Sequence, residues 1–265
     1  MQSVPRSTVV VFSLVTCVGC AAPSSQYAEP QSYAASCDGE APLDRPLKLA
    51  NYNIKSGMWT TFEEVAAVLQ DIDADVIALE EVDNQLPRSG GVDQSKDLAD
   101  RLGAERMFAG AWEKEGGSYG IALLSRLPIL QSERFDLPMA NGAEPRVGID
   151  AIVCAGNKPM NVVASHADFL PWSAAAHGEA LGEHIADRSD VVLMGDLNIP
   201  PEHSSILGII STGVNDVLSQ FTDQPTFADT RIDYLFTDRE VLDARVIETE
   251  ASDHKPVWTT MQLND

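Results

Sequence analysis

The fold of this chain is decided by residues 47–82, LKLANYNIKSGMWTTFEEVAAVLQDIDADVIALEEV. Apolar side chains alternate along residues 47–54, which predicts a strand. Residues 61–69 offer a threonine as N-cap, two early acids and apolar side chains at helical spacing, so they predict a helix. Residues 75–82 form a second apolar run, which predicts a buried strand that ends in acids. The segment is therefore a strand, a helix and a strand, with polar side chains at the end of each strand.

The same kinds of pattern continue along the rest of the chain. A second amphipathic helix is predicted over residues 93–103, where a glycine stops it. Strand-like runs recur at residues 120–124, 146–154, 160–166, 190–194, 231–236, 241–247 and 256–261. Between these runs, residues 174–187 and 201–210 have helical spacing. Many strands, few helices and no repeat of fixed period predict two packed sheets with helices outside, in a single domain.

Composition excludes several classes of protein. The chain has 265 residues, of which 44% are hydrophobic and 22% are charged, so a disordered chain, a collagen-like repeat and a coiled coil are poor fits. Its 18 Lys and Arg against 40 Asp and Glu give a net charge of -22. Non-specific affinity for nucleic acid comes from Lys and Arg that displace counterions, so the charge disfavours a binder of long DNA. It suits a carboxylate-lined metal site or a salty environment.

Residues 1–20 have the features of an export signal. A single charge, Arg6, precedes the apolar run at residues 9–15, which is too short to span a bilayer. Small residues precede Cys20, and Ala, Pro and Ser follow it, which resembles a bacterial lipoprotein signal with Cys20 as the acylated residue. Processing at Cys17 and a plain secretory signal are the alternatives. We expect an exported protein, periplasmic or at the cell surface, anchored by lipid to a bacterial membrane.

A tether and one folded domain are predicted after the signal. Residues 21–43 are rich in Ala, Ser, Pro and Gln without a hydrophobic period, which indicates a flexible spacer, and residues 44–265 form the domain. Cys37 in the tether and Cys154 in the body are available for a disulfide in an oxidising compartment. The sequence gives no distance between them, so their pairing stays open.

Polar side chains gather at the ends of the predicted strands. They are Asn51 and Asn53, Glu80 and Glu81, His166 and Asp168, Asp196 and Asn198, Asp233, and Asp253 and His254. Ligand sites on layered scaffolds are commonly built at such positions. Carboxylate and amide oxygens suit Mg²⁺, Mn²⁺ or Ca²⁺ better than structural zinc. A hard cation beside His and Asp is equipped to hydrolyse a phosphate ester.

Eight motifs, in order, resemble those of the endonuclease/exonuclease/phosphatase superfamily. They are Asn51-Tyr52-Asn53-Ile54, Leu79-Glu80-Glu81-Val82, residues 119–129, Glu144-Pro145-Arg146, Ser165-His166-Ala167-Asp168, Gly195-Asp196-Leu197-Asn198, Arg231-Ile232-Asp233-Tyr234 and residues 252–257. The resemblance runs from about Leu47 to Met261. It implies an α/β (α+β) fold, a four-layer α/β/β/α sandwich in which two mixed sheets pack face to face with helices outside.

The resemblance also implies a metal site. Glu81 is expected to ligate a divalent cation, Mg²⁺ with Mn²⁺ or Ca²⁺ as alternatives, with Asn53 beside it and Asp253 near the metal. Many members of the superfamily have Gln-Glu where this chain has Glu80-Glu81. Glu80 is therefore expected to face away as a solvated acid, or to add local negative charge. Arg146 is expected to bind the substrate phosphate, with a structural ion pair as the alternative.

The other implied roles are catalytic. Asp196 is expected to orient or deprotonate the attacking water, and Asn198 to hold a phosphoryl oxygen. His254 is expected to contact the scissile phosphate, with Asp233 fixing its tautomer. His166 is expected to be the second imidazole at the phosphate. The carboxylate that orients this second histidine in deoxyribonuclease-like members has no counterpart that the sequence identifies.

Two further patterns are read as structural. Residues 116–120 fit the G-x-S-x-G motif of serine hydrolases, but polar residues precede them and a β-like run follows, whereas that motif needs a strand before the serine and a helix after it. His177, His184 and His203 lack metal-ligand spacing, so we expect them to support the fold.

The resulting expectation is a monomeric, exported phosphoesterase that acts on phosphodiesters in preference to monoesters. Small or lipid-derived phosphate esters are favoured over long nucleic acid. The alternatives are an extracellular nuclease, a sphingomyelin or phospholipid diesterase, and a non-catalytic binding protein on the same fold. A lipid diesterase needs an exposed apolar loop, for which Trp59 and residues 169–172 are candidates, with packing over the site as the other interpretation.

Overall fold

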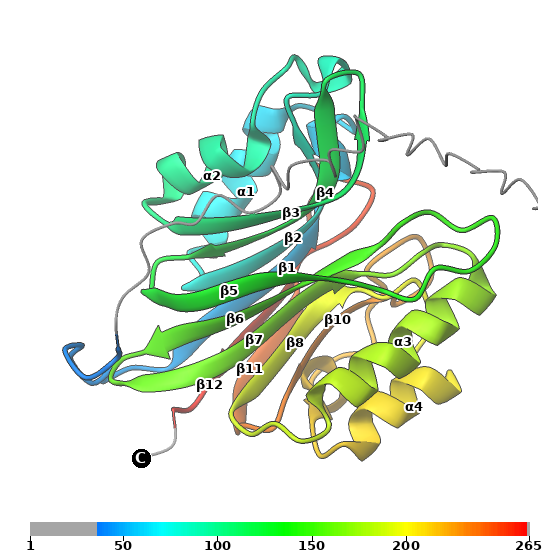
Figure 1. Ribbon diagram of the computed structural model, residues 1–265. Helices are drawn as coiled ribbons and strands as arrows, with labels where there is room; N and C mark the ends of the chain where they lie inside the picture. Colours follow the sequence, from blue (N-terminus) through cyan, green and yellow to red (C-terminus); the bar gives the residue numbers. More distant parts are fainter. Residues whose placement is uncertain (1–35, 264–265) are drawn as a thin grey trace, which may run out of the picture.

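The computed structural model describes residues 36–263, which build two six-stranded sheets (Figure 1). The first sheet has the order β11-β12-β1-β2-β4-β3, and the second has the order β5-β6-β7-β8-β10-β9. Strands of the first are β1 (Leu47–Asn53), β2 (Val76–Asn84), β3 (Glu105–Lys114), β4 (Gly117–Ser125), β11 (Val241–Val246) and β12 (Val257–Met261). Strands of the second are β5 (Ile129–Asp136), β6 (Val147–Ala155), β7 (Lys158–His166), β8 (Val191–Asp196), β9 (Asn215–Asp216) and β10 (Asp233–Thr237). Both sheets are mixed, because β1–β2 and β7–β8 are parallel pairs among antiparallel ones.

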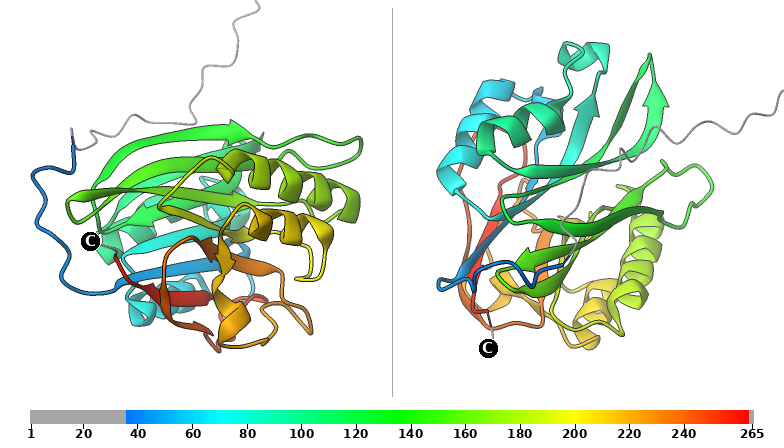
Figure 2. Two further views of the ribbon diagram at one scale, coloured as in Figure 1. Left: turned by 90° about the horizontal axis from the view of Figure 1, so that it is seen from below. Right: turned by 60° about the vertical axis from the view of Figure 1, so that its left-hand side comes forward.

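Helices cover the outer face of each sheet, so the molecule has four layers (Figures 1 and 2). The helices are α1 (Phe62–Ile72), α2 (Gln94–Leu102), α3 (Pro171–Ile185) and α4 (Ser204–Ser211). The first two pack on the first sheet, and the other two pack on the second. Short 3-10 turns occur at Lys55–Gly57, Pro87–Ser89 and Val217–Gln220. This arrangement confirms the predicted sandwich. Within residues 36–263, the helices are too short or too polar to cross a membrane.

Local sequence signals set the ends of the first two helices as predicted. The Thr61 side chain accepts from the backbone N–H of Glu64, whose carboxylate accepts from the backbone N–H of Thr61, and this reciprocal pair starts α1. The Asp93 side chain caps the start of α2 by accepting from the backbone N–H of Lys96, and Gly103 ends the helix in a left-handed conformation.

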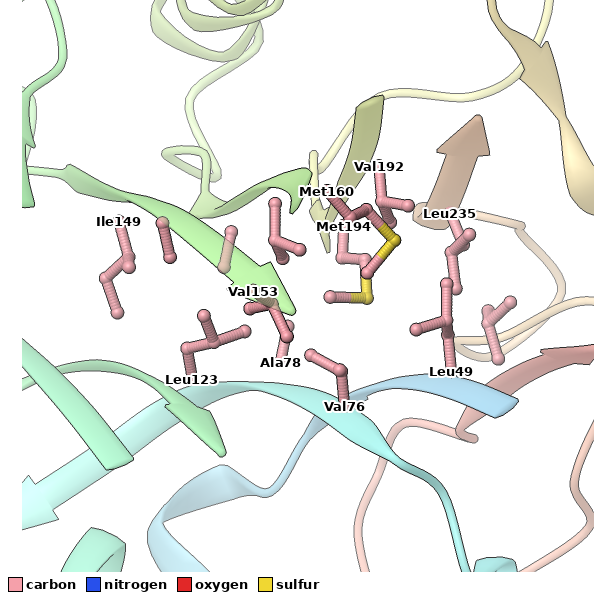
Figure 3. Close-up of a cluster of buried hydrophobic side chains, with 14 of the residues drawn as sticks. Leu49, Val76, Ala78, Leu123, Ile149, Val153, Met160, Val192, Met194 and Leu235 are labelled. Carbon is pink, nitrogen blue, oxygen red and sulfur yellow. The ribbon is translucent and has the colours of Figure 1, made fainter. Parts of the chain in front are cut away.

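The core between the sheets is built from alternate residues of their strands (Figure 3). On the first sheet Leu49, Val76, Ala78 and Leu123 point inward, and Ile149, Val153, Met160, Val192, Met194 and Leu235 face them from the second. All ten are buried, and a buried side chain of the size of leucine contributes about 1.5 to 3 kcal/mol. Since side chains of a strand alternate between faces, this core fixes which way the later residues of each strand point.

Three strands were not predicted from the sequence, and all three are edge strands. β3 ends the first sheet, while β5 and β9 end the second. β3 and β5 carry the segments ERMFAGAWEK and ILQSERFD, in which charged residues interrupt the apolar alternation. Charges on edge strands protect a sheet from pairing with another chain, and they also hide the strand pattern. β3 and β4 form a hairpin across residues 116–120, which confirms that this segment is not a nucleophile elbow.

Cys37 and Cys154 form a disulfide that joins the segment before β1 to β6. Cys37 is buried, and Leu43 packs against the core between the sheets. Residues 36–43, which the sequence assigned to the flexible tether, are therefore held against the body. The proposed signal, with Cys20, and residues 21–35 of the proposed tether lie outside the described residues.

Candidate active site

The candidate site lies at the polar end of the rows of side chains that form the core. On β7, Met160, Val162 and Ala164 belong to the core, and the next inward residue is His166. β8 follows the same rule, because Val192 and Met194 lead to Asp196. In β1 the core leucines lead to Asn51 and Asn53, and in the antiparallel β10 Asp233 precedes Leu235. Strand periodicity therefore brings these polar groups into one buried cluster between the sheets.

A β-bulge in β2 redirects Glu81 toward this cluster. The pairing of β2 with β4 shifts between Leu79 and Val82, and Glu81 has a left-handed backbone with φ 55°. A regular strand would send Glu81 to the helix-covered face, where Leu79 and Val82 lie. With the extra residue, the Glu81 carboxylate instead accepts from Asn53 Nδ2 at 3.3 Å. The strand continues to Asn84, so it does not end at the acids as the sequence suggested.

Glu80 is buried, which corrects its expected position as a solvated acid. Its side chain is 1% exposed, and neither carboxylate oxygen has a hydrogen-bond partner among the described residues. Burial, followed by the charges of Asp233 and Asp196, raises the pKa of Glu80 well above its ordinary value. The raised pKa favours the neutral form of Glu80, and a neutral acid resembles the glutamine that the family resemblance led us to expect here.

Gly195 is a buried glycine that directly precedes Asp196 on β8. A Cβ atom on Gly195 would lie 2.1 Å from the carbonyl oxygen of Ser165 on the neighbouring strand. Only glycine lets β7 and β8 approach this closely. This close approach places His166 directly opposite Asp196 in the parallel pair. The backbone N–H of Ala167 donates to the carbonyl oxygen of Asp196 at 2.8 Å.

His254 is held by a carboxylate, as the sequence predicted. Its Nδ1 lies 2.9 Å from Asp233 Oδ2, and both side chains are buried. Burial alone lowers the pKa of His254, but the negative charge of Asp233 and the hydrogen bond to it raise the pKa to about 9. The imidazole is thus protonated at neutral pH, and its Nε2 lies 3.7 Å from Asp196 Oδ2. Such a group can donate a hydrogen bond or a proton to a substrate oxygen.

Asp196 lies at the centre of the cluster. Its Oδ2 accepts a hydrogen bond from Asn53 Nδ2 at 3.0 Å, and its Oδ1 accepts from the backbone N–H of Asn198. Burial, followed by the charge of Asp233, raises the pKa of Asp196 to about 7. A carboxyl group with this pKa can accept a proton from water near neutral pH.

His166 is held by an arginine, where deoxyribonuclease-like members use a carboxylate. Arg146 Nη1 lies 3.0 Å from His166 Nδ1, and Arg146 Nη2 donates to Glu144 Oε2 at 3.1 Å. Because a guanidinium can only donate, Nδ1 accepts and the proton of the neutral ring is on Nε2. Burial and the charge of Arg146 hold the pKa of His166 well below its usual range. Nε2 faces Asp196 Oδ2 at 3.5 Å, with the amide of Asn198 beside it. Direct phosphate binding by Arg146 stays a prediction.

Two residues of the site have no role in the sequence interpretation. Lys55 directly follows the first motif, and its Nζ lies 3.4 Å from Glu81 Oε1 and 3.3 Å from Asp253 Oδ2. Tyr119 opens the motif at residues 119–129, where burial raises its pKa and a hydrogen bond with Arg146 opposes that shift. Their places next to the motifs were the available signal, but only the fold shows that they reach the cluster.

The donor set fits a hard divalent cation. Glu81, Asp253 and Asp196 contribute carboxylates around Asn53 and Lys55, and hard cations prefer such oxygen ligands. Asp196, Asp233 and His254 also place one ligand atom each within 4.8 Å of one another. Since Asp233 Oδ2 is hydrogen-bonded to His254, we assign Asp233 and His254 to proton transfer with Asp196 as the base, and we assign Glu81 and Asp253 to the metal. The buried Asp233 Oδ1 has no partner among the described residues.

The remaining histidines support the fold, as predicted. His177 lies between the carbonyl oxygen of Pro138 and the backbone N–H of Asp168. His184 is 2.8 Å from Asp150, and His203 caps the start of α4 by accepting from the backbone N–H of Ser205.

Comparisons with known proteins agree with this fold. The family described as the Endonuclease/Exonuclease/phosphatase family matches residues 50–254. A search of curated proteins gave no match. One similar solved structure is an endonuclease/exonuclease/phosphatase from Beutenbergia cavernae DSM 12333, which is 24% identical with a TM-score of 0.70. The alignment covers 83% of this chain and 72% of that protein's chain.

Two further solved structures share the fold at lower identity. A mannosyl-6-phosphatase of Bacteroides thetaiotaomicron VPI-5482 is 19% identical over 82% of this chain and 100% of its own, with a TM-score of 0.64. TDP2 of D. rerio, complexed with single strand DNA product, is 17% identical with a TM-score of 0.64, and the alignment covers 83% of this chain and 100% of the TDP2 chain. Members of the matched family hydrolyse phosphate esters and generally depend on a divalent metal. The matched segment contains every residue of the cluster and most of the chain, and the chain therefore belongs to the Endonuclease/Exonuclease/phosphatase family.

Proposed function

We propose that this protein is an exported, divalent-metal-dependent phosphodiesterase that hydrolyses a P–O bond by in-line attack of water. The observation that carries the proposal is the pair formed by Asp196 and His254, 3.7 Å apart. One has a pKa near neutrality and the other a pKa of about 9, so a base and a proton donor coexist at neutral pH. Pairs of groups whose environments separate their pKa values are typical of acid–base catalysis.

Each residue has a distinct part in the proposed reaction. Asp196 accepts the proton of the attacking water, and His254 donates to a phosphoryl or leaving oxygen. His166, fixed as the neutral Nε2–H form, donates a hydrogen bond to another phosphoryl oxygen. Glu81 and Asp253 would hold the cation, which when bound would supply charge neutralisation for the phosphoryl group. Asn198 stands beside His166, where its amide can contact the same oxygen.

The charges at the site favour a diester over a monoester. Among the described residues, Lys55, Arg146 and the protonated His254 are cationic side chains at the cluster, and each is already paired with an acid. A phosphate monoester carries close to two negative charges at neutral pH, whereas a diester carries one. The diester therefore needs less positive charge in a site that contains several carboxylates.

The net charge of -22 supports a small or lipid-derived ester over long nucleic acid. Phe169 and Trp172, which follow His166 in the sequence, are about 60% exposed, and a lipid diesterase would use such side chains at a membrane surface. An extracellular nuclease is the second candidate, because the structure of TDP2 with single strand DNA product shares this fold. A non-catalytic binding protein is disfavoured, because it would not need the complete set of polar residues.

The proposal is tested by hydrolysis of bis(p-nitrophenyl) phosphate and p-nitrophenyl phosphate with Mg²⁺, Mn²⁺ or Ca²⁺. We expect faster release from the diester, loss of release in EDTA and recovery when the metal is restored. Equal release with and without EDTA would contradict metal dependence. Faster release from the monoester would replace the diesterase with a phosphatase.

We also propose that the protein is monomeric and attached to a bacterial membrane through Cys20. Cys20→Ser should stop lipidation, so the protein should move from the membrane to the soluble fraction. Cys17→Ser is the matched control, and it should leave fractionation unchanged. The opposite result would assign lipidation to Cys17, and no effect of either variant would support a plain secretory signal.

A further inference from the structure

An open pocket of about 670 Å³ lies beside His254, and three separate segments line it. Trp59 and Thr60 come from the loop before α1, and Phe227 and Ala228 come from the loop before β10. Thr249, Glu250, Ser252 and Asp253 come from the loop before β12. The Phe227 ring contacts the His254 imidazole in a tilted arrangement, with the two centroids 4.6 Å apart. The pocket therefore begins where the catalytic cluster ends, and its size suits a small organic group.

The groups that this pocket offers to a ligand are aromatic faces and negative charge. The Trp59 side chain is 58% exposed, and that of Phe227 is 37% exposed. The exposed Glu250 carboxylate makes no hydrogen bond or ion pair with any residue in the described part of the chain. Asp253 stands at the border between the pocket and the proposed metal site. No Lys or Arg is among the described residues that line the pocket, so a second phosphate or a carboxylate would be repelled.

The hydroxyl groups of the pocket are already engaged. Thr60 Oγ1 donates to the carbonyl oxygen of Ala251 at 3.2 Å, and Thr249 Oγ1 accepts from the backbone N–H of Ala251 at 3.1 Å. A sugar or a nucleobase is recognised through several hydrogen bonds as well as stacking. Ser252 Oγ, the third hydroxyl, donates to the carbonyl oxygen of Asn53 at 2.8 Å. Because these hydroxyls bond within the protein, the rings and the Glu250 carboxylate are the principal recognition groups.

We propose that this pocket binds an ammonium-bearing organic group attached to the substrate phosphate. An organic cation placed over the face of Trp59 or Phe227 is attracted by the ring, and the Glu250 carboxylate adds to that attraction. This inference rests on the proposed function, because the pocket adjoins the place where the phosphate would meet His254. It assigns the substrate to phosphate esters of amino alcohols, and it gives Trp59 the role of a specificity residue.

The test compares two ligands that have the same phosphate and nearly the same shape. Phosphocholine has a quaternary nitrogen where 3,3-dimethylbutyl phosphate has a quaternary carbon. We expect titration calorimetry with Mg²⁺ to show phosphocholine binding about fivefold or more tighter than its neutral analogue. Trp59→Ala and Glu250→Gln should each reduce this ratio toward one. Trp172→Ala removes a tryptophan that is similarly exposed but lies at the start of α3 and does not line the pocket, so it should leave the ratio unchanged.

The outcomes separate this inference from the proposed function. A ratio near one, no measurable phosphocholine binding at millimolar concentration, or a ratio that Trp59→Ala and Glu250→Gln do not change would overturn the inference. Tighter binding of thymidine 5′-phosphate than of phosphocholine would assign the pocket to a nucleobase instead. Hydrolysis of bis(p-nitrophenyl) phosphate, measured in parallel, tests the catalytic cluster alone. Turnover without ammonium preference overturns only the pocket, and preference without turnover overturns only the proposed reaction.

Discussion

The two histidines of the site are held by opposite kinds of partner. Asp233 accepts from His254 Nδ1, whereas Arg146 donates to His166 Nδ1. The carboxylate stabilises an imidazolium, and the guanidinium stabilises a neutral ring with its proton on Nε2. Two identical side chains are thereby given different protonation states within one cluster, and only His254 is prepared to release a proton.

The partner of His254 sets where activity is lost at high pH. The pKa of His254 is raised to about 9, so an activity that needs the imidazolium is present below that pH and lost as pH rises through it. Asp233→Asn removes the charge and should move this alkaline limb of kcat/KM toward the ordinary histidine range, near pH 6.5. A pH–rate profile of both proteins checks this. An alkaline limb that stays near pH 9 in Asp233→Asn would show that another group is responsible.

Lys55 and a divalent cation should compete for the same oxygens. Lys55 Nζ lies within 3.4 Å of Glu81 and Asp253, so the ammonium weakens the attraction of these carboxylates for a metal. Lys55→Met should bind Mg²⁺ about fivefold tighter, as expected for loss of one half-exposed ion-pair partner. Calorimetric titration with Mg²⁺ measures this. Lys48→Met breaks the remote ion pair with Asp73 and should not change Mg²⁺ affinity, and an equal effect of both variants would contradict the competition.

At the scale of elements, the sequence predicted what strand and helix periodicity can specify. The strands that lead to the polar cluster have apolar alternation on buried faces, so they and their polar ends were identified, as was α2 between Asp93 and Gly103. Edge strands such as β3 lack that pattern because charges interrupt it. The bulge at Glu81 depends on pairing between β2 and β4, which no local pattern specifies. For the same reason, the contact between Arg146 and His166 could not be predicted.

The disulfide joins two elements that no strand pairing connects. Cys37 and Cys154 are 117 positions apart, so the bridge removes much freedom from the unfolded chain. The double variant Cys37→Ser, Cys154→Ser should lose about 3 to 5 kcal/mol of unfolding free energy. Denaturant unfolding measures this loss, and a reducing agent should produce it in the unchanged protein as well. A variant as stable as the parent would show that the bridge adds little to the fold.

At the scale of the whole molecule, the net charge of -22 should favour the hydrolysis of small phosphate esters over that of long nucleic acids. Duplex DNA should be cleaved more slowly than bis(p-nitrophenyl) phosphate, because the protein and the DNA backbone repel each other. Raising the salt from about 0.05 M to about 0.3 M should speed DNA cleavage by screening and leave the small ester unaffected. Faster DNA cleavage at low salt would instead indicate a nuclease with a local basic surface.

The central claim is that Asp196 and His254 act together as base and proton donor on a phosphodiester. The measurement that tests it most directly is kcat for bis(p-nitrophenyl) phosphate with Mg²⁺ in Asp196→Asn, in His254→Ala and in the double variant. Each single variant should lose about 10²-fold to 10⁴-fold in kcat. The double variant should lose little more than the worse single one, because groups that act as a unit are not additive. Turnover at the unchanged rate in either single variant would contradict the claim.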